Sequence, residues 1–462
     1  MAQFLKGSVV MNKTVFLILL LAFIPLEARQ VAVIGCGHIG LVMAAVFSKS
    51  SHTVLCVDID QGRIAKLKNK QLPIYEPNLE QLLFERIDQN IFFFNTVREA
   101  ICADIFYICV PTPSDAHGEC DCSFLYAAFQ DVLQECVRQD EQKIICIKST
   151  VPPGTMRQLQ NQLLRQGNNQ IHLVYNPEFV REGSALRDVY GITPIVLGAD
   201  SLEAIEKVEE FYQDLLGDNL TYIKTNFETA ELIKYAWNTF SAIRIAYVNE
   251  LALLSRQFGA NIASVVQGLA LSEQLLPTGM IKPGPGYGGA CLPKEALLLS
   301  NVMRGGKISS SLAHQAGASN RNHINRLIQD IFAQLGSEPA QKTVAVLGLS
   351  FKAQTSDIRD APSIAVLQAL IEEGVSIRAY DPKAIDSMKV LFPHVHYFNS
   401  PYEAVCGADC IVVLTEWEEI RALDLEHMAS LCNTKIMVDA RNVYDPALLK
   451  KYGFMYINMG RV

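Results

Sequence analysis

The stretch Gln30-Val-Ala-Val-Ile-Gly-Cys-Gly-His-Ile-Gly40 decides the fold of the first half of this 462-residue chain. Its apolar start predicts a short buried strand, and Leu41–Ser48 after it predicts a helix. Gly35, Gly37 and Gly40 fit the pattern G-x-G-x-x-G. In that pattern the first glycine allows a tight turn, the second admits a pyrophosphate, and the third lets helix and strand pack closely. The stretch therefore predicts a dinucleotide-binding turn, the alternative being a turn without a ligand.

The next predicted strand, 52–58, ends in an acid and indicates which dinucleotide the turn binds. Asp58 would accept hydrogen bonds from an adenosine ribose and repel a 2′-phosphate, which favours NAD over NADP. Arg63 could neutralise a 2′-phosphate and so weakens that preference. We expect His38 and Ile39, which lie within the turn, to contact the cofactor as well.

The remaining pattern predicts an α/β fold. Further strands alternate with helices, which indicates a doubly wound parallel sheet. From Glu228 to about Phe258 the chain lacks Pro and Gly and has apolar residues at helical spacing, so we predict one long helix capped by Thr225 or Asn226. The glycine-rich residues 275–294 predict a loop. The further strands are predicted at 91–95, 105–110, 143–148, 343–348, 375–380, 410–414 and 435–439.

We therefore predict two Rossmann-like, doubly wound parallel-sheet domains joined by a helical middle domain with a long central helix. The expected boundaries are 1–29 for an amino-terminal extension, 30–220 for the NAD-binding domain, 221–325 for the helical domain and 326–462 for the second α/β domain. A chain of this length normally forms two or three domains.

Composition restricts the partners. The net charge of −8 argues against a nucleic-acid partner. The twelve cysteines include several in apolar strand-like runs, which indicates reduced thiols rather than disulfides. Cys120-Asp121-Cys122 has no second pair at zinc-finger spacing, so we expect no metal site.

The amino terminus resembles a secretory signal, with Lys6 and Lys13 before the apolar run Val15–Ile24 and Ala28 after it. The run is too short to span a membrane comfortably, and a strand is predicted from Gln30. We expect a non-functional extension on a cytoplasmic protein; an export or anchoring signal is the alternative.

The segment Gly284-Pro-Gly-Tyr-Gly-Gly-Ala-Cys-Leu-Pro-Lys-Glu295 gives the strongest indication of the chemistry, because it contains a candidate nucleophile. Cys291 behind a glycine-rich loop can be a thiolate nucleophile, the alternative being a buried structural cysteine. Lys234 and Asn238 are four residues apart and share one helix face, where they could stabilise a developing oxyanion. Alternatively, Lys234 is a solvated helix lysine. Glu178 and Glu182 are also four apart and could transfer protons or lie on the surface.

This segment resembles the nucleophile loop of the UDP-glucose/GDP-mannose dehydrogenase family. Further blocks resemble the family in order, so that the resemblance covers nearly everything after residue 29. These blocks are Pro73–Pro77, Val110–Pro113, Ser149–Thr155, Asn176–Ser184, Ala230–Asn238, Leu347–Lys352 and Asp357–Pro362.

The resemblance implies that a sugar primary alcohol is oxidised to a carboxylate with two NAD and one water. It implies that Cys291 attacks the intermediate aldehyde, that Glu178 and Thr150 act through a water, and that Glu295 helps to orient water. Implied cofactor contacts, besides the turn, Asp58 and Arg63, are Pro111, Thr112, Thr150, Glu182, Lys294 and Arg359. Implied substrate contacts are Glu178, Phe179, Val180, Glu182, Lys234, Asn238, Lys282, Tyr287, Gly288, Cys291, Phe351, Lys352 and Arg441.

The resemblance also implies that the second α/β domain binds the nucleotide half of the substrate. The long helix is expected to form the core of a homodimer or higher homo-oligomer. Leu414–Trp417, Asp439–Asn442 and the closing Gly460-Arg461 are most similar to the members that oxidise UDP-glucose to UDP-glucuronate.

Three positions depart from the family pattern. Glu295 stands where the family usually has Asp, and Leu275 and Pro194 stand where it usually has Arg. The departures leave other substrates open, namely GDP-mannose or a UDP-N-acetylhexosamine, and also a weakly active nucleotide-sugar-binding paralogue. A third alternative is a 2-hydroxyacid or hydroxyacyl dehydrogenase of similar layout, which would need no cysteine.

Overall fold

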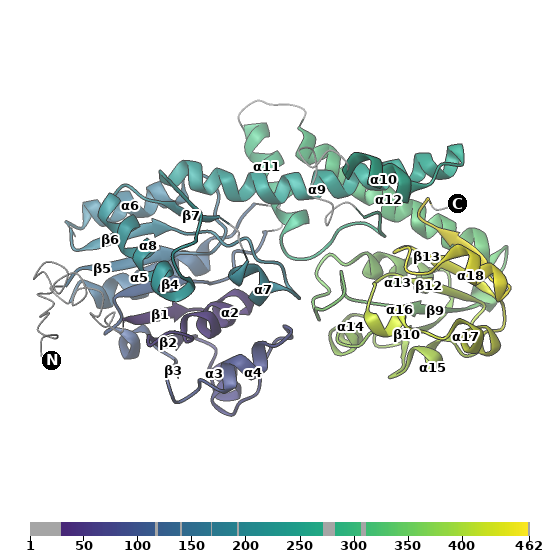
Figure 1. Ribbon diagram of the computed structural model, residues 1–462, viewed down its shortest axis with the longest axis horizontal. Helices are drawn as coiled ribbons and strands as arrows, with labels where there is room; N and C mark the ends of the chain where they lie inside the picture. The colour runs from purple at the N-terminus through teal and green to yellow at the C-terminus, as the bar shows by residue number, and fades with distance from the viewer. Residues whose placement is uncertain are drawn as a thin grey trace, which may run out of the picture.

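Two α/β units lie at opposite ends of one long helix, α9 (Phe227–Phe258), in the computed structural model (Figure 1). The structure describes residues 29–115, 119–138, 141–167, 169–191, 194–270, 282–305 and 311–460. The signal-like residues 1–28 and the departure at Leu275 lie outside the described residues.

The first unit is an eight-stranded sheet in the order β3-β2-β1-β4-β5-β6-β7-β8. All neighbouring strands pair in parallel except β6 and β7, which are antiparallel. Its strands are β1 (Gln30–Ile34), β2 (Thr53–Val57), β3 (Ile91–Phe94), β4 (Ile105–Ile108), β5 (Lys143–Ile147), β6 (Ile171–Tyr175), β7 (Ile195–Gly198) and β8 (Tyr222–Thr225). Its helices are α2 (His38–Phe47), α3 (Gln61–Lys68), α4 (Leu79–Phe84), α5 (Ser123–Cys136), α6 (Thr155–Arg165), α7 (Ala185–Tyr190) and α8 (Leu202–Leu216).

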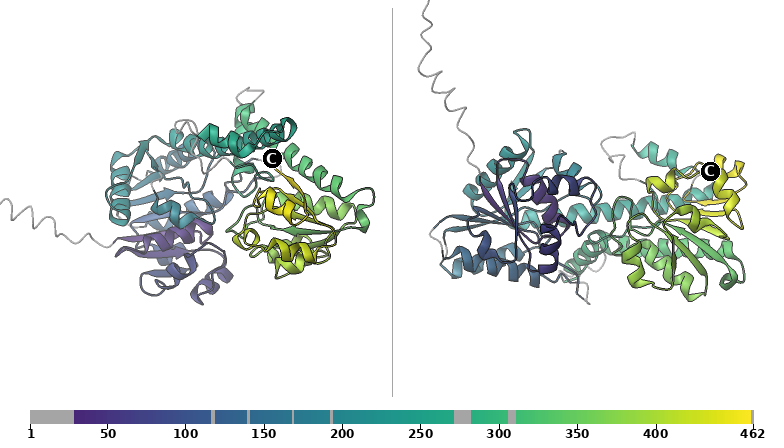
Figure 2. Two further views of the ribbon diagram at one scale, coloured as in Figure 1. Left: turned by 45° about the vertical axis from the view of Figure 1, so that its right-hand side comes forward. Right: turned by 90° about the horizontal axis from the view of Figure 1, so that it is seen from below.

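The central strands of this sheet are mostly apolar because helices cover both faces (Figure 2). Val31, Ala32 and Val33 are fully buried, and each of the four residues of β4 is at most 2% exposed. The strand order reverses between β1 and β4, which pair in parallel up to their carboxyl ends at Ile34 and Ile108. Ligands bind at this edge in doubly wound folds.

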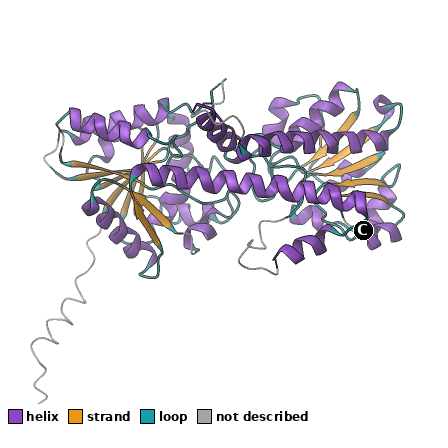
Figure 3. Ribbon diagram, turned by 90° about the horizontal axis from the view of Figure 1, so that it is seen from above, coloured by secondary structure: helices purple, strands orange, loops and turns teal. Residues whose placement is uncertain are grey.

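The middle region consists of α9 and the helices α10 (Ile262–Ala270), α11 (Leu292–Gly305) and α12 (Leu312–Leu335) (Figure 3). Asn226 caps α9 by accepting a hydrogen bond from the Thr229 N–H at 2.9 Å, in agreement with one of the two predicted caps. Small side chains, among them Ala242 and Ala246 of α9, form a buried cluster with residues of α11 and α12. Close packing of this kind holds three helices side by side.

One boundary prediction was wrong. The loop predicted over 275–294 ends earlier, because α11 begins at Leu292. Pro293 occupies the first turn of that helix, where the missing N–H of proline costs no hydrogen bond. The proline was therefore a sign of a helix start rather than of a loop.

The second unit is a six-stranded sheet in the order β11-β10-β9-β12-β13-β14, which repeats the order of the first six strands of the first sheet. Its strands are β9 (Thr343–Leu347), β10 (Ser376–Tyr380), β11 (His396–Tyr397), β12 (Cys410–Val413), β13 (Ile436–Asp439) and β14 (Met455–Asn458). Its helices are α13 (Pro362–Glu372), α14 (Ile385–Leu391), α15 (Pro401–Val405), α16 (Glu418–Arg421), α17 (Leu425–Leu431) and α18 (Pro446–Lys451).

Two parallel-sheet units separated by a long helix confirm the predicted fold class. Within the described part of the chain, no helix is both long and apolar enough to cross a membrane.

Candidate active site

The glycine turn after β1 leaves room for a ligand. Gly35 has a φ of +97°, which allows the chain to reverse into α2. A Cβ on Gly37 would meet no atom within 4 Å, whereas one on Gly40 would lie 1.8 Å from the Gly35 carbonyl oxygen. Among the described residues, no side chain caps the amino terminus of α2. Its N–H groups are therefore available to a phosphate, and the turn fits a dinucleotide.

Asp58 follows β2 and lies beside this turn, 7% exposed. Its carboxylate accepts hydrogen bonds from the Cys36 N–H at 2.8 Å and the Asp60 N–H at 2.9 Å. Arg63 Nη1 lies 3.1 Å from Asp58 Oδ2, so the guanidinium is paired with the acid. Arg63, the cation that could neutralise a 2′-phosphate, is thus paired with Asp58, the residue expected to bind a ribose.

Glu76 is a buried carboxylate in the family-like block Pro73–Pro77 that was not among the predicted site residues. It is 3% exposed and lies 2.8 Å from His38 Nε2. It also accepts hydrogen bonds from the N–H groups of Gly183 at 2.7 Å and Ala185 at 2.8 Å. Glu76 therefore ties the start of α2 to the segment that contains Glu182. No spacing in the sequence could reveal this role, because the partners lie 38 to 109 residues away.

A second set of contacts joins the loop after β4 to α11, the helix that directly follows Cys291. Thr112 Oγ1 donates to the carbonyl oxygen of Thr150 at 2.8 Å. Lys294 Nζ donates to the carbonyl oxygen of Thr112 at 2.8 Å. Pro111 is exposed next to this contact. The predicted cofactor residues 111, 112, 150 and 294 thus lie together.

Lys234 points from α9 toward Glu178. Its Nζ donates to the Glu178 carbonyl oxygen at 2.6 Å and to Glu178 Oε1 at 3.1 Å, with the lysine side chain 3% exposed. Glu178 Oε2 accepts from the Val180 N–H at 2.7 Å, and the Lys234 ammonium lies 5.3 Å from the Phe179 ring centroid. Burial lowers the pKa of Lys234, but Glu178, Glu295 and Cys291 together raise it above its ordinary value. Lys234 is therefore a charged ammonium rather than a solvated surface group.

Asn238 lies one turn further along α9 and binds the other acid of the site. Its Nδ2 donates to Glu295 Oε2 at 2.6 Å. Glu295 is fully buried, and its Oε1 has no hydrogen-bond partner among the residues that the structure describes. Burial raises the pKa of Glu295, and Lys234, Lys294 and Asn238 oppose that rise. The carboxyl group therefore holds a proton more readily than an exposed glutamate does.

Cys291 immediately precedes α11, and its carbonyl oxygen accepts from the Glu295 N–H at 2.8 Å. The residue is exposed to solvent, yet much of its surroundings is protein. Desolvation and Glu295 raise the pKa of the thiol to about 12, and Lys234 opposes them. The Cys291 thiol is thus a weaker acid than an ordinary cysteine thiol.

The loop that ends at Cys291 also contacts the second unit. A Cβ on Gly288 would lie 2.2 Å from the Asp360 carbonyl oxygen, so only glycine fits there. The Gly289 N–H donates to the Arg359 carbonyl oxygen at 2.7 Å, and the Phe351 ring packs against Gly289. The second sheet is therefore in contact with the nucleophile loop.

Arg441 lies behind Phe351 in the second unit. It donates to the carbonyl oxygens of Phe351 and Leu414, both at 2.9 Å, and its Nε lies 3.0 Å from Glu416 Oε2. Burial lowers the pKa of Lys352, with Glu182 opposing the shift. Lys282, which lies two residues before Gly284 of the nucleophile loop, is exposed.

Glu182 links the two units directly. It accepts from Thr355 Oγ1 at 3.0 Å and from Arg359 Nη2 at 3.3 Å. The structure therefore gathers the predicted chemical residues of the first unit, the helices and the second unit around one loop. Tyr287 is an exception, because its ring is buried in the alanine cluster between the helices. Pro194 precedes β7 and supplies no cation.

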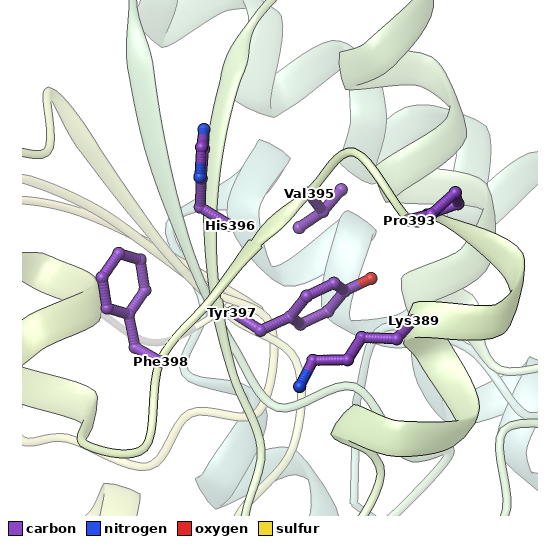
Figure 4. A pocket seen from close by; sticks show the side chains of 6 residues that line it. All are labelled: Lys389, Pro393, Val395, His396, Tyr397 and Phe398. Atoms are coloured by element: carbon purple, nitrogen blue, oxygen red, sulfur yellow. The ribbon is translucent and has the colours of Figure 1, made fainter.

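Two other features lie apart from this site. A pocket of about 480 Å³ lies beside edge strand β11, and Figure 4 shows its lining of Lys389, Pro393, Val395, His396, Tyr397 and Phe398, none of which is a predicted site residue. The sulfur atoms of Cys120 and Cys122 lie 3.7 Å apart. The described residues include no group of three or more His, Cys, Asp or Glu that could hold a metal ion.

Comparison with known proteins identifies the three regions. Residues 29–216 match the NAD binding domain of the UDP-glucose/GDP-mannose dehydrogenase family, residues 228–322 its central domain and residues 345–446 its UDP binding domain. These matches confirm the predicted family and the prediction of NAD. The chain is 36% identical over 439 residues to the UDP-glucose 6-dehydrogenase of Rhizobium meliloti (strain 1021), a match that covers 94% of this chain and 99% of the relative.

Two solved structures are similar along almost the whole chain. The UDP-glucose dehydrogenase of Pyrobaculum islandicum superimposes with a TM-score of 0.87 at 26% identity, covering 95% of this chain and all of that one. The UDP-D-ManNAc dehydrogenase of Pyrococcus horikoshii superimposes with a TM-score of 0.80 at 28% identity, covering 94% of this chain and 99% of that one.

Proposed function

The chain belongs to the UDP-glucose/GDP-mannose dehydrogenase family and is an NAD-binding nucleotide-sugar dehydrogenase; from this premise we propose that it oxidises UDP-glucose to UDP-glucuronate. The observation that carries the proposal is the cluster of Cys291, Lys234, Asn238, Glu178 and Glu295 at the meeting point of the three regions. A thiol with a buried ammonium and two carboxyl groups suits an oxidation that passes through a covalent adduct.

The reaction needs two oxidations and one hydrolysis. When bound, NAD would supply the hydride acceptor for each of the two oxidations. Lys234, kept charged by its neighbours, stabilises the negative charge that develops on the oxygen of the reacting sugar carbon. The Cys291 thiol adds to the aldehyde carbon, and oxidation of the resulting thiohemiacetal gives a thioester. Water then cleaves the thioester, which releases the carboxylate and restores the thiol.

Glu178 and Thr150 are proposed to hold the water for proton transfer, and Asn238 to hold Glu295 beside the nucleophile. In this chain the longer glutamate reaches the Asn238 amide, and its second oxygen has no partner within the described part of the chain. We propose that this free oxygen orients the hydrolytic water. We also propose residues 30–220 as the NAD-binding domain and 326–462 as the domain for the nucleotide half of the substrate, which Lys352 and Arg441 would contact.

A second candidate substrate is another nucleotide sugar, such as a UDP-N-acetylhexosamine. The similarity to a UDP-D-ManNAc dehydrogenase and the missing cation at Pro194 favour testing it. UDP-glucose remains first because the full-length relative at 36% identity is a UDP-glucose 6-dehydrogenase.

The test is to incubate the purified protein with UDP-glucose and NAD and to count NADH per sugar consumed. Two NADH per sugar, with UDP-glucuronate as product, are expected. A clear preference for another nucleotide sugar would overturn the substrate, and no turnover with any donor would indicate a binding paralogue. Turnover that survived Cys291→Ser would favour a hydroxyacid dehydrogenase, which needs no thiol.

We further propose that the protein forms a homodimer through α9. Large apolar side chains recur along the exposed side of this helix at spacings close to a heptad repeat. They are Trp237, Phe240, Tyr247, Leu254 and Phe258, between 43% and 75% exposed. A stripe this long on one helix is typical of a protein interface. Light scattering should give a dimer mass, and Tyr247→Glu should give a monomer; a wild-type monomer would contradict the proposal.

A further inference from the structure

Three polar side chains hold the backbone of the nucleophile loop between two helices. Asn249 of α9 accepts a hydrogen bond from the Gly284 N–H at 2.9 Å. His323 of α12 lies 2.7 Å from the Gly284 carbonyl oxygen through its Nε2. Asn320 of α12 pairs with both backbone groups of Tyr287, accepting from its N–H and donating to its carbonyl oxygen, each at 2.9 Å.

We propose that Asn249, Asn320 and His323 are positioning residues that hold the loop so that Cys291 meets the reacting carbon. The expected effect on catalysis rests on the proposed function, whereas the hydrogen bonds that hold the loop are independent of it. None of the three was singled out from the sequence, and the contacts that place them join residues 33 to 39 positions apart.

The burial of the three side chains indicates that the contacts are strong. All three are less than 9% exposed, and burying a polar group without a partner is costly. The carbonyl oxygen of Gly284 can only accept, so His323 must carry its proton on Nε2. Burial lowers the pKa of His323, which keeps the ring neutral in this role. Four hydrogen bonds therefore fix residues 284 and 287 at once.

The segment between Tyr287 and Cys291 needs this support because its own side chains supply little packing. Between the fixed residue Tyr287 and the nucleophile lie two glycines and an alanine, and Gly289 has a φ of +86°. Glycine has wide backbone freedom, so the segment would sample many conformations without external contacts. Cys291 itself is exposed and cannot anchor the loop by packing.

A loosened loop should affect the two oxidations differently. The first oxidation needs NAD and the sugar alcohol, but the second needs the thiol within bonding distance of the aldehyde. Misplacement of a reacting group by about 1 Å can cost on the order of 10²-fold in rate. We therefore expect the aldehyde to escape before Cys291 captures it, so that NADH per sugar falls from two toward one.

The experiment compares Asn320→Asp with Asn322→Asp on the same helix. Asn320→Asp removes the donor to Tyr287 and places a carboxylate against its carbonyl oxygen, whereas Asn322 is exposed and serves as the matched control. NADH per sugar is counted with semicarbazide present to trap free aldehyde. Trapped aldehyde and a ratio near one for Asn320→Asp, against two for Asn322→Asp, support the proposal. Equal ratios of two, with equal kcat/KM, overturn it.

A second pair of variants, at Asn249, tests the proposal if the Asn320→Asp protein does not fold. Asn249→Leu removes the acceptor for Gly284, whereas Asn249→Asp retains an oxygen there and replaces an amide nitrogen that has no partner among the described residues with a second oxygen. Aldehyde release by Asn249→Leu with near wild-type behaviour of Asn249→Asp supports a positioning role. Identical behaviour of the two variants overturns it.

A readout without substrate separates this inference from the proposed function. Alkylation of Cys291 by iodoacetamide, followed by peptide mass spectrometry, requires no turnover. A changed rate in Asn320→Asp but not in Asn322→Asp supports the positioning role even if UDP-glucose proves not to be the substrate. An unchanged rate in both overturns it, whatever the wild-type protein oxidises.

Discussion

The two sheets share one strand order, but the turns after their first strands differ in what surrounds them. In the first unit Asp58 accepts two backbone N–H groups and pairs with Arg63. In the second unit Asp381 takes the corresponding place at the end of β10 and is 1% exposed. It accepts from six donors, which are the N–H groups of Leu349, Ser350, Lys383 and Ala384, Ser350 Oγ and Trp417 Nε1.

The difference shows how one topology serves two purposes. The space beside Gly37 is open, whereas the corresponding residue of the second turn is Ser350, whose Oγ donates to Asp381 at 3.1 Å and lies 3.3 Å from Trp417 Nε1, so that side chains fill the second turn. An acid whose oxygens are saturated by protein donors cannot also bind a ribose. The first turn therefore fits a cofactor, and the second holds the fold together.

The largest expected effect tests the structural role of the second acid. Asp381→Ala leaves six buried donors without their acceptor and should destabilise the protein by about 3–5 kcal/mol. Asp58→Ala should cost about 1–2 kcal/mol, because fewer donors are lost and the site is nearer to solvent. Denaturant unfolding of both variants measures the difference. Equal losses would show that the two turns do not differ as described.

The next effect concerns the open turn. Gly37→Val introduces a side chain into space that contains no protein atom within 4 Å of the new Cβ, at a φ of −79° that valine tolerates. Stability should change by less than about 1 kcal/mol. NAD affinity should fall about 100-fold, because the side chain occupies the path of the pyrophosphate. Calorimetric titration measures both affinities, and unchanged binding would mean that the dinucleotide lies elsewhere.

A smaller effect sharpens the role of Asp58. In Asp58→Ser the acid is removed, and Arg63 loses the partner that now lies 3.1 Å away. The ratio of kcat/KM for NAD to that for NADP should fall about tenfold. The substitution removes the carboxylate that repels a 2′-phosphate, and it frees the Arg63 guanidinium to attract one. In the control Asp381→Asn, the ratio should not change.

The smallest effect isolates one hydrogen bond of the filled turn. Trp417→Phe retains most of the buried ring but removes the indole N–H that lies 3.2 Å from Asp381. The expected cost is about 1–2 kcal/mol, from the lost hydrogen bond and the smaller ring. NAD affinity should stay at the wild-type value. A change in NAD affinity would indicate that the second turn communicates with the cofactor site.

Local patterns determined much of this protein. The turn from Gly35 to Gly40, the alternating strands and the unbroken helix α9 are visible in the sequence, because they depend on spacings of a few residues. Cys291, Lys234 and Glu178 were predicted from motif and family resemblance, and the structure brings them together.

Tertiary structure decided the rest. Glu76, Asn249, Asn320 and His323 each act on backbone groups far away in the chain. The pairing of Arg63 with Asp58 and the filling of the second turn by Trp417 depend on side-chain direction in the folded protein. The physical reason is that a hydrogen bond between distant segments requires only that the fold place donor and acceptor within about 3 Å. Such a contact leaves no periodic trace in the sequence, whereas helices, strands and turns do.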